Sequence, residues 1–222
     1  MTQINEAKIA AHDLGVEAKK IELKKFSDIT NDISTRLGLA ESVQKYNQRD
    51  ITRADTFGNY VTKSQRNQQM ADLSSNEALK REEADRLQAQ LDSSVASGMI
   101  AYGSLEWQNL AKQIQDAQNA AEDYNIQIKQ TELKKFDDIN NKLETRMSLL
   151  QSIIKLNEQD ISDADTFGNY VTASQRDLQQ ANLARLRDEK QNQANELQAQ
   201  LNESVANGFV QVGSEEWEKL QK

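Results

Sequence analysis

The stretch ADTFGNYVT at Ala54–Thr62 returns letter for letter at Ala164–Thr172, 110 residues later. Other landmarks repeat at the same spacing: ELKKF at Glu22–Phe26 and Glu132–Phe136, SQR at Ser64–Arg66 and Ser174–Arg176, and LQAQL at Leu87–Leu91 and Leu197–Leu201. About half of the residues from Glu22 to Leu110 match their counterparts without a gap. Because loops tolerate insertions cheaply, a gapless repeat indicates that the length of each element matters geometrically. The sequence therefore predicts two helical repeats, residues 1–110 (copy one) and 111–222 (copy two).

Apolar residues between these landmarks lie three and four positions apart, as in Phe26, Ile29, Ile33 and Leu37. This spacing places a narrow apolar stripe on one face of a helix, and the absence of proline leaves long helices unobstructed. We expect helices near residues 3–55, 63–97, 105–163 and 173–207, and a short one from Glu215. The fold class is all-α. A long helix shared over about 105–163 would join overlapping three-helix bundles, an architecture that resembles the spectrin repeat without its Trp and charge positions. An extended coiled coil is the alternative.

Two kinds of helix boundary recur in both copies. Gly98 and Gly208 each precede an apolar residue, as the C-terminal Schellman motif requires, and Ser104 and Ser214 precede acidic residues, as expected of helix N-caps. The other boundary lies in the ADTFGNYVT stretch, followed by a capping box that begins at Thr62 or Thr172. At that boundary we expect a turn, and a helix that continues with a kink at the glycine is the competing interpretation.

The composition excludes several kinds of site and partner. The formal net charge of −8 opposes binding to nucleic-acid phosphates, and with one His and no Cys there is no Cys/His metal site. Mean hydropathy is −0.81 and aromatic residues make up 5%, so a thick central core is not expected. No apolar run is long enough for a membrane span, and we expect no signal peptide. The expected partners are proteins, through self-association or with other structural proteins, and not nucleic acid, a membrane or a small-molecule substrate.

No catalytic, cofactor-binding or metal-binding residues are predicted. His12 has no ligand-forming neighbours at metal spacing, and adjacent acidic residues on a helix point about 100° apart, so they do not converge. The paired lysines of each ELKK motif, Lys24–Lys25 and Lys134–Lys135, are expected on solvated helix faces. Trp107 and Trp217 are expected to pack against the links that follow the shorter helices. One candidate interaction site consists of the aromatic residues of the repeated corner: Phe57, Tyr60, Phe167 and Tyr170. A buried plug at this corner is the other interpretation.

A family resemblance follows from the region between Gly103 and Ile139. Its elements are Gly-Ser-x-Glu-Trp at Gly103–Trp107, Ile114, the Tyr-Asn-x-x-Ile stretch at Tyr124–Ile128, and Lys-Phe-Asp-x-Ile at Lys135–Ile139. These resemble the repetitive helical regions of tail tape measure proteins from long-tailed phages and prophages of Gram-positive bacteria. The similarity covers about half of each unit, and the ADTFGNYVT corner and the LQAQL helix lie outside it. The resemblance implies a ruler that sets tail length, located in the virion or, during assembly, in the bacterial cytoplasm.

The sequence thus favours a non-enzymatic structural protein, a spacer or ruler segment whose output is length. The alternative is a protein-binding helical module of a bacterial surface or cytoskeletal protein, which would present its corners to a protein ligand.

Overall fold

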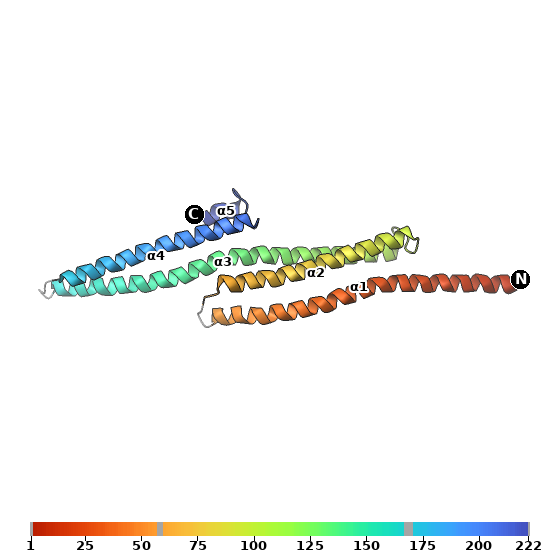
Figure 1. Ribbon diagram of the computed structural model, residues 1–222, viewed down its shortest axis with the longest axis horizontal. Coiled ribbons are helices and arrows are strands. Elements are labelled where there is room, and N and C mark those ends of the chain that lie inside the picture. The colour runs from red at the N-terminus through yellow and green to blue at the C-terminus, as the bar shows by residue number, and fades with distance from the viewer. Residues whose placement is uncertain (1, 57–59, 167–170, 222) are drawn as a thin grey trace. The chain divides into compact units, whose positions relative to one another are not determined.

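The computed structural model describes residues 2–56, 60–166 and 171–221, and these residues form five helices with short links (Figure 1). The helices are α1 (Thr2–Thr56), α2 (Lys63–Ala96), α3 (Leu105–Thr166), α4 (Ala173–Ala206) and α5 (Glu215–Gln221). No strand occurs within the described ranges, so the predicted all-α class is confirmed. Each predicted helix boundary lies within three residues of the observed one.

The helix ends follow from local sequence. Gly98 has a φ of +73°, its N–H donates to the carbonyl of Val95 at 3.0 Å, and the next N–H, of Met99, donates to the carbonyl of Ser94 at 3.0 Å. This pair of bonds is the predicted Schellman motif. The hydroxyl oxygen of Ser104 accepts the N–H of Trp107 at 3.2 Å, which confirms the predicted N-cap of α3.

Copy two closes its helices in the same way. Gly208 has a φ of +74°, and the N–H of Phe209 donates to the carbonyl of Ser204 at 2.9 Å. The hydroxyl oxygen of Ser214 accepts the N–H of Trp217 at 3.2 Å. The two links therefore have the same backbone design.

The chain reverses direction between α1 and α2. α1 ends at Thr56 and α2 begins at Lys63, and the two helices run antiparallel, since Asn47 bonds Asp72 while Arg36 pairs with Glu82. A single helix running through this corner is thereby excluded in copy one. Gly58 and Gly168, where we expected the turn or kink, lie outside the described residues.

The contacts divide the chain into two compact units. Unit 1 comprises residues 1–50 and 67–128, and unit 2 comprises residues 51–66 and 129–222. The units differ from the two sequence repeats because the corner of copy one, residues 51–66, belongs to unit 2. α3 is one continuous helix of 62 residues that contributes to both units.

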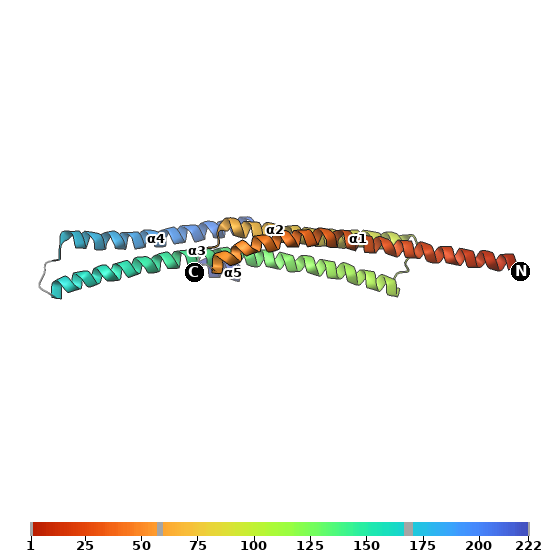
Figure 2. The same ribbon diagram turned by 90° about the horizontal axis from the view of Figure 1, so that it is seen from below.

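Unit 1 has a core built from three helices and a link. Phe26 of α1, Leu87 and Leu91 of α2, Ile100 of the link and Ile114 of α3 are buried in one cluster. Figures 1 and 2 show α1, α2 and the first part of α3 side by side, whereas the beginning of α1 has no helix of unit 1 beside it. Apolar side chains on this first part of α1 are exposed: Ile4, Ile9, Leu14, Val16 and Ile21.

Unit 2 repeats this core at the end of α4. Phe136 of α3, Leu201 of α4 and Val210 of the link form the cluster, and Trp217 of α5 packs against it. In unit 1, Trp107 packs against the cluster that contains Ile100, and its ring centroid lies 4.6 Å from that of Tyr102. The predicted packing of both Trp residues against the links is confirmed.

Candidate functional site

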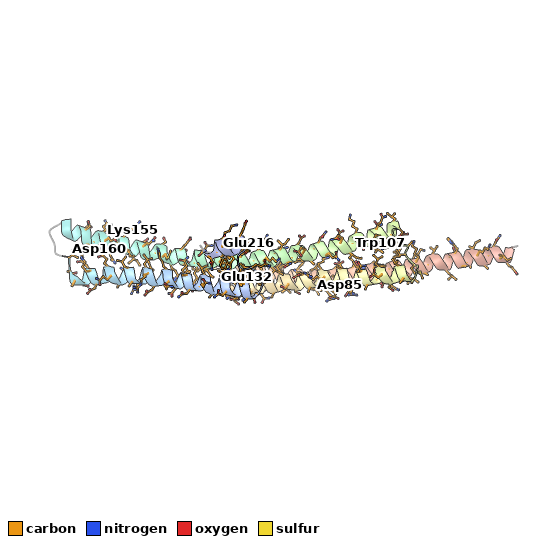
Figure 3. The ribbon with its side chains drawn as sticks, turned by 90° about the horizontal axis from the view of Figure 1, so that it is seen from above. Asp85, Trp107, Glu132, Lys155, Asp160 and Glu216 are labelled. Carbon is orange, nitrogen blue, oxygen red and sulfur yellow. The ribbon has the colours of Figure 1, made fainter. Side chains whose placement is uncertain are left out.

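A buried polar network joins α3 to α4 in unit 2. The hydroxyl of Ser204 and the side-chain amide of Gln200 donate to Oε1 of Glu132 at 2.5 and 2.7 Å, and Nζ of Lys135 lies 2.6 Å from Oε2. The side chains of Lys135 and Glu132 are 5% and 1% exposed. Figure 3 shows Glu132 on α3 inside the side-chain cluster of this unit. Both carboxylate oxygens of Glu132 are therefore engaged, and the network acts as a polar clamp between two helices.

The spacing of these residues produces the network. Glu132 and Lys135 are three positions apart on α3, and Gln200 and Ser204 are four apart on α4. Residues at these spacings share a helix face, so antiparallel packing of the two faces brings all four side chains together. Ser204 has a second role, because its carbonyl accepts the link N–H groups of Phe209 and Val210 at 2.9 and 3.2 Å.

The corner of copy one docks beside this network. Nε and Nη2 of Arg66 donate to the two carboxylate oxygens of Asp138 at 2.7 and 3.0 Å, with side-chain exposures of 8% and 16%. Val61 is buried in a small cluster with Ile51 and Ala54. The bidentate geometry fixes the corner in position and orientation on α3.

A capping box gives the corner its local shape. The backbone N–H of Thr62 donates to the side-chain oxygen of Gln65 at 2.8 Å, and the N–H of Gln65 donates to the hydroxyl oxygen of Thr62 at 3.2 Å. These bonds fix the start of α2, so Arg66 lies in its first turn and Val61 just before it. Lys63 forms an ion pair with Glu203 of α4.

A groove of about 650 Å³ lies between this corner and helices α3 and α4. Its lining includes Tyr60, Thr62, Ile139, Lys142, Glu196 and Ala199. Tyr60 is 39% exposed, so its ring borders the groove and solvent. The other predicted corner aromatics, Phe57, Phe167 and Tyr170, lie outside the described residues. The docking role of the four aromatics stays a prediction.

Copy one contains the same polar network with a different exposure. Oε1 of Glu22 accepts from Ser94 at 2.5 Å and from Gln90 at 2.6 Å, and Nζ of Lys25 donates to Oε2 at 2.7 Å. The hydrogen bond from Lys25, followed by that from Ser94, lowers the pKa of the Glu22 carboxyl below its ordinary value. The side chain of Lys25 is 53% exposed, about ten times the exposure of Lys135.

One sequence-based expectation is wrong. Lys135 was expected on a solvated helix face and is instead buried, because the corner of copy one and Glu132 enclose it. Lys24, Lys25 and Lys134 are exposed as expected. Glu-x-x-Lys on one helix and Gln-x-x-x-Ser on the next are the sequence signal of the polar network, but both copies carry them, so they do not distinguish the buried Lys135 from the exposed Lys25.

The residues weighed for metal binding do not gather. His12 is exposed on α1, and no group of three or more His, Asp or Glu residues at metal-binding positions occurs among the residues that the structure describes. None of the described helices combines the length and apolar character needed to cross a membrane.

Comparison of the chain with protein-family models, with curated proteins and with solved structures finds no match.

Proposed function

We propose that this chain is a non-enzymatic structural repeat protein that acts as a spacer or ruler, most concretely a segment of a phage tail tape measure protein. One observation carries the proposal: both copies build the same clamp and the same helix ends at a spacing of 110 residues. Ser94 and Ser204 occupy identical positions in these two networks. A spacer needs this constancy because its output is a fixed length for each repeat.

The helix lengths support the same function. α2 and α4 both contain 34 residues, and the links that follow them, residues 97–104 and 207–214, are equally long. A binding protein that works through one site has no need to keep every helix and loop at a constant length, since surface loops tolerate insertions. The side chains of the buried polar network around Glu132 bind one another and hold α3 and α4 together.

The proposal is tested by changing the number of repeats. One, two or three copies of the 110-residue unit are inserted into the repetitive helical region of a tape measure gene in a tractable phage of a Gram-positive bacterium. Tail length, measured by electron microscopy, should rise by an equal step for each unit. The step should be smaller than the length of one continuous 110-residue helix, about 165 Å at 1.5 Å per residue, because the unit folds back at its corner. As a control, an unrelated helical insert of 110 residues should give the same step. Tails of unchanged length would refute the spacer function.

The groove beside Tyr60 favours a second candidate, a protein-binding helical module of a bacterial surface or cytoskeletal protein. Its partly exposed tyrosine and volume of about 650 Å³ suit a side chain of a protein ligand. In this case Tyr60→Ala would abolish binding to that ligand. The matched control is Tyr46→Ala, which removes a 68% exposed tyrosine on α1, away from the groove.

A further inference from the structure

The two copies share a corner sequence but differ in what covers it. Arg66 and Val61 of copy one are each 7% exposed, because they dock on α3 and α4 in unit 2. Their counterparts in copy two are Arg176, which is exposed, and Val171, which is half-buried. The corner of copy two carries the same docking residues with no described helix to receive them.

A matching empty face exists in unit 1. The counterparts of Asp138 and Lys135 are Asp28 and Lys25, and both are exposed. The rest of the receiving surface is also present: Ile29, Ala89 and Gln90 correspond to Ile139, Ala199 and Gln200. Copy one therefore presents a surface equivalent to the one on which the copy-one corner docks, and copy two presents an equivalent corner that no described helix covers.

The differences between the two surfaces preserve their complementarity. In the docked corner of copy one, Lys63 pairs with Glu203 of α4. Ala173 stands at the position of Lys63 in the corner of copy two, and Ser93 stands at the position of Glu203 in unit 1, so both charges of this pair are absent.

A second pair of charges is exchanged rather than lost. Lys142 and Glu196 at the groove correspond to Asp32 and Arg86, whose ion pair is 2.6 Å long. Docking of the copy-two corner would thus leave no unpaired charge at the Ala173 and Ser93 positions or at the Asp32 and Arg86 positions.

A second pair of surfaces shows the same pattern. Ile114 of α3 is 4% exposed and Leu73 of α2 is 2% exposed, because both are buried in unit 1. Their counterparts, Ile4 of α1 and Leu183 of α4, are 64% and 49% exposed. Figures 1 and 2 show the beginning of α1 without a neighbouring helix of its own unit.

We propose that a second copy of this chain covers these surfaces in a head-to-tail contact. The corner at Val171–Arg176 of one molecule docks on the Lys25 and Asp28 face of the next, whose residues 2–21 lie along α4 of the first. The contact joins different surfaces of the two molecules, and each molecule therefore keeps a free surface for a further copy, unlike the subunits of a symmetric dimer. This inference does not depend on the spacer function.

The test is sedimentation velocity of the full chain from micromolar to millimolar concentration. The mean mass of the wild-type chain should rise steadily with concentration. Arg176→Glu and Asp28→Arg should each weaken association by about 30-fold, since each places like charges against one another at a covered site. Mixing the two variants, or combining both changes in one chain, should restore association because opposite charges face each other again.

Lys155→Glu is the matched control for charge. It reverses one positive charge on α3 at a position that is exposed in both copies, as its counterpart Lys45 shows, and should leave association unchanged. Circular dichroism verifies that every variant keeps the helical content of the wild type. Leu183→Glu, at an exposed position of the isolated chain, provides a second independent block.

Three results would overturn the proposal. The first is a constant monomer mass over the whole concentration range, and the second is a closed dimer that stops growing. The third is association that Arg176→Glu and Leu183→Glu leave unaffected, which would place the contact elsewhere on the chain.

Discussion

Replacing Asp138 with alanine should destabilise unit 2 strongly, whereas the same change at Asp28 should have little effect. Asp138 receives two hydrogen bonds from Arg66, at 2.7 and 3.0 Å, and the arginine side chain is 8% exposed. Removal of the carboxylate takes both of these hydrogen bonds away from a guanidinium that is almost fully buried. Loss of one partner of a buried ion pair costs about 3 kcal/mol or more, and we expect a decrease of this size in the free energy of unfolding.

Asp28 is the internal control because it occupies the equivalent position of copy one but is exposed. Asp28→Ala should change the free energy of unfolding by less than about 0.5 kcal/mol, as is usual for surface substitutions. Both changes replace an aspartate by alanine within a helix, so the difference between them isolates the contribution of the corner.

The assay is urea unfolding followed by tryptophan fluorescence, at a concentration where the chain is monomeric. Trp217 packs in the core of unit 2 and Trp107 packs in that of unit 1, so a Trp107→Phe background reports on unit 2 alone. Equal midpoints for Asp138→Ala and Asp28→Ala would refute the reasoning, because they would mean that the corner contributes nothing to the stability of unit 2.

Further predictions concern pH and helix ends. The pKa of the Glu22 carboxyl is lowered in the folded chain, so the unfolded chain takes up this proton first as the pH falls. The free energy of unfolding should therefore decrease as the pH drops below 4.5. Glu22→Gln should flatten this dependence in acid titrations followed by circular dichroism. Gly208→Ala should lower the free energy of unfolding by about 1–2 kcal/mol because φ is +74°, whereas Gly15→Ala inside α1 should raise it by about 1 kcal/mol, both measured by urea unfolding. Thr172→Ala should cost about 1 kcal/mol in the same assay through loss of the capping box of α4, and an unchanged midpoint would contradict this.

The helices and their ends could be predicted from the sequence because their causes are local. A glycine before an apolar residue, as at Gly98, and a serine before acidic residues, as at Ser104, act within one helical turn. The apolar spacing and the absence of proline then set the helix lengths. Packing of Trp107 was predictable for the same reason, since this residue lies in the first turn of the helix that follows the link.

The burial of Lys135 could not be predicted in this way. Lys25 and Lys135 lie in the same five-residue motif, yet one is exposed and the other is enclosed. The difference arises from the corner of copy one, which is about 70 residues away in sequence from the surface that it covers. The local sequence is nearly the same around Lys25 and Lys135, so it does not indicate on which of these two surfaces the corner of copy one docks. The corner aromatics Phe57, Phe167 and Tyr170 lie outside the described residues, and their prediction stays untested.

The division of the chain between its units has a consequence for dissection and recombination. Unit 1 takes residues 1–50 and 67–128, so no uninterrupted fragment contains all of one unit without a piece of the other. A fragment that ends at residue 110 would keep the corner and lose Asp138, the residue that receives it. Gene rearrangements that add or delete whole 110-residue periods, wherever the breakpoints fall, leave every internal corner with a receiving face. Deletions of any other length shift one partner out of register with the other.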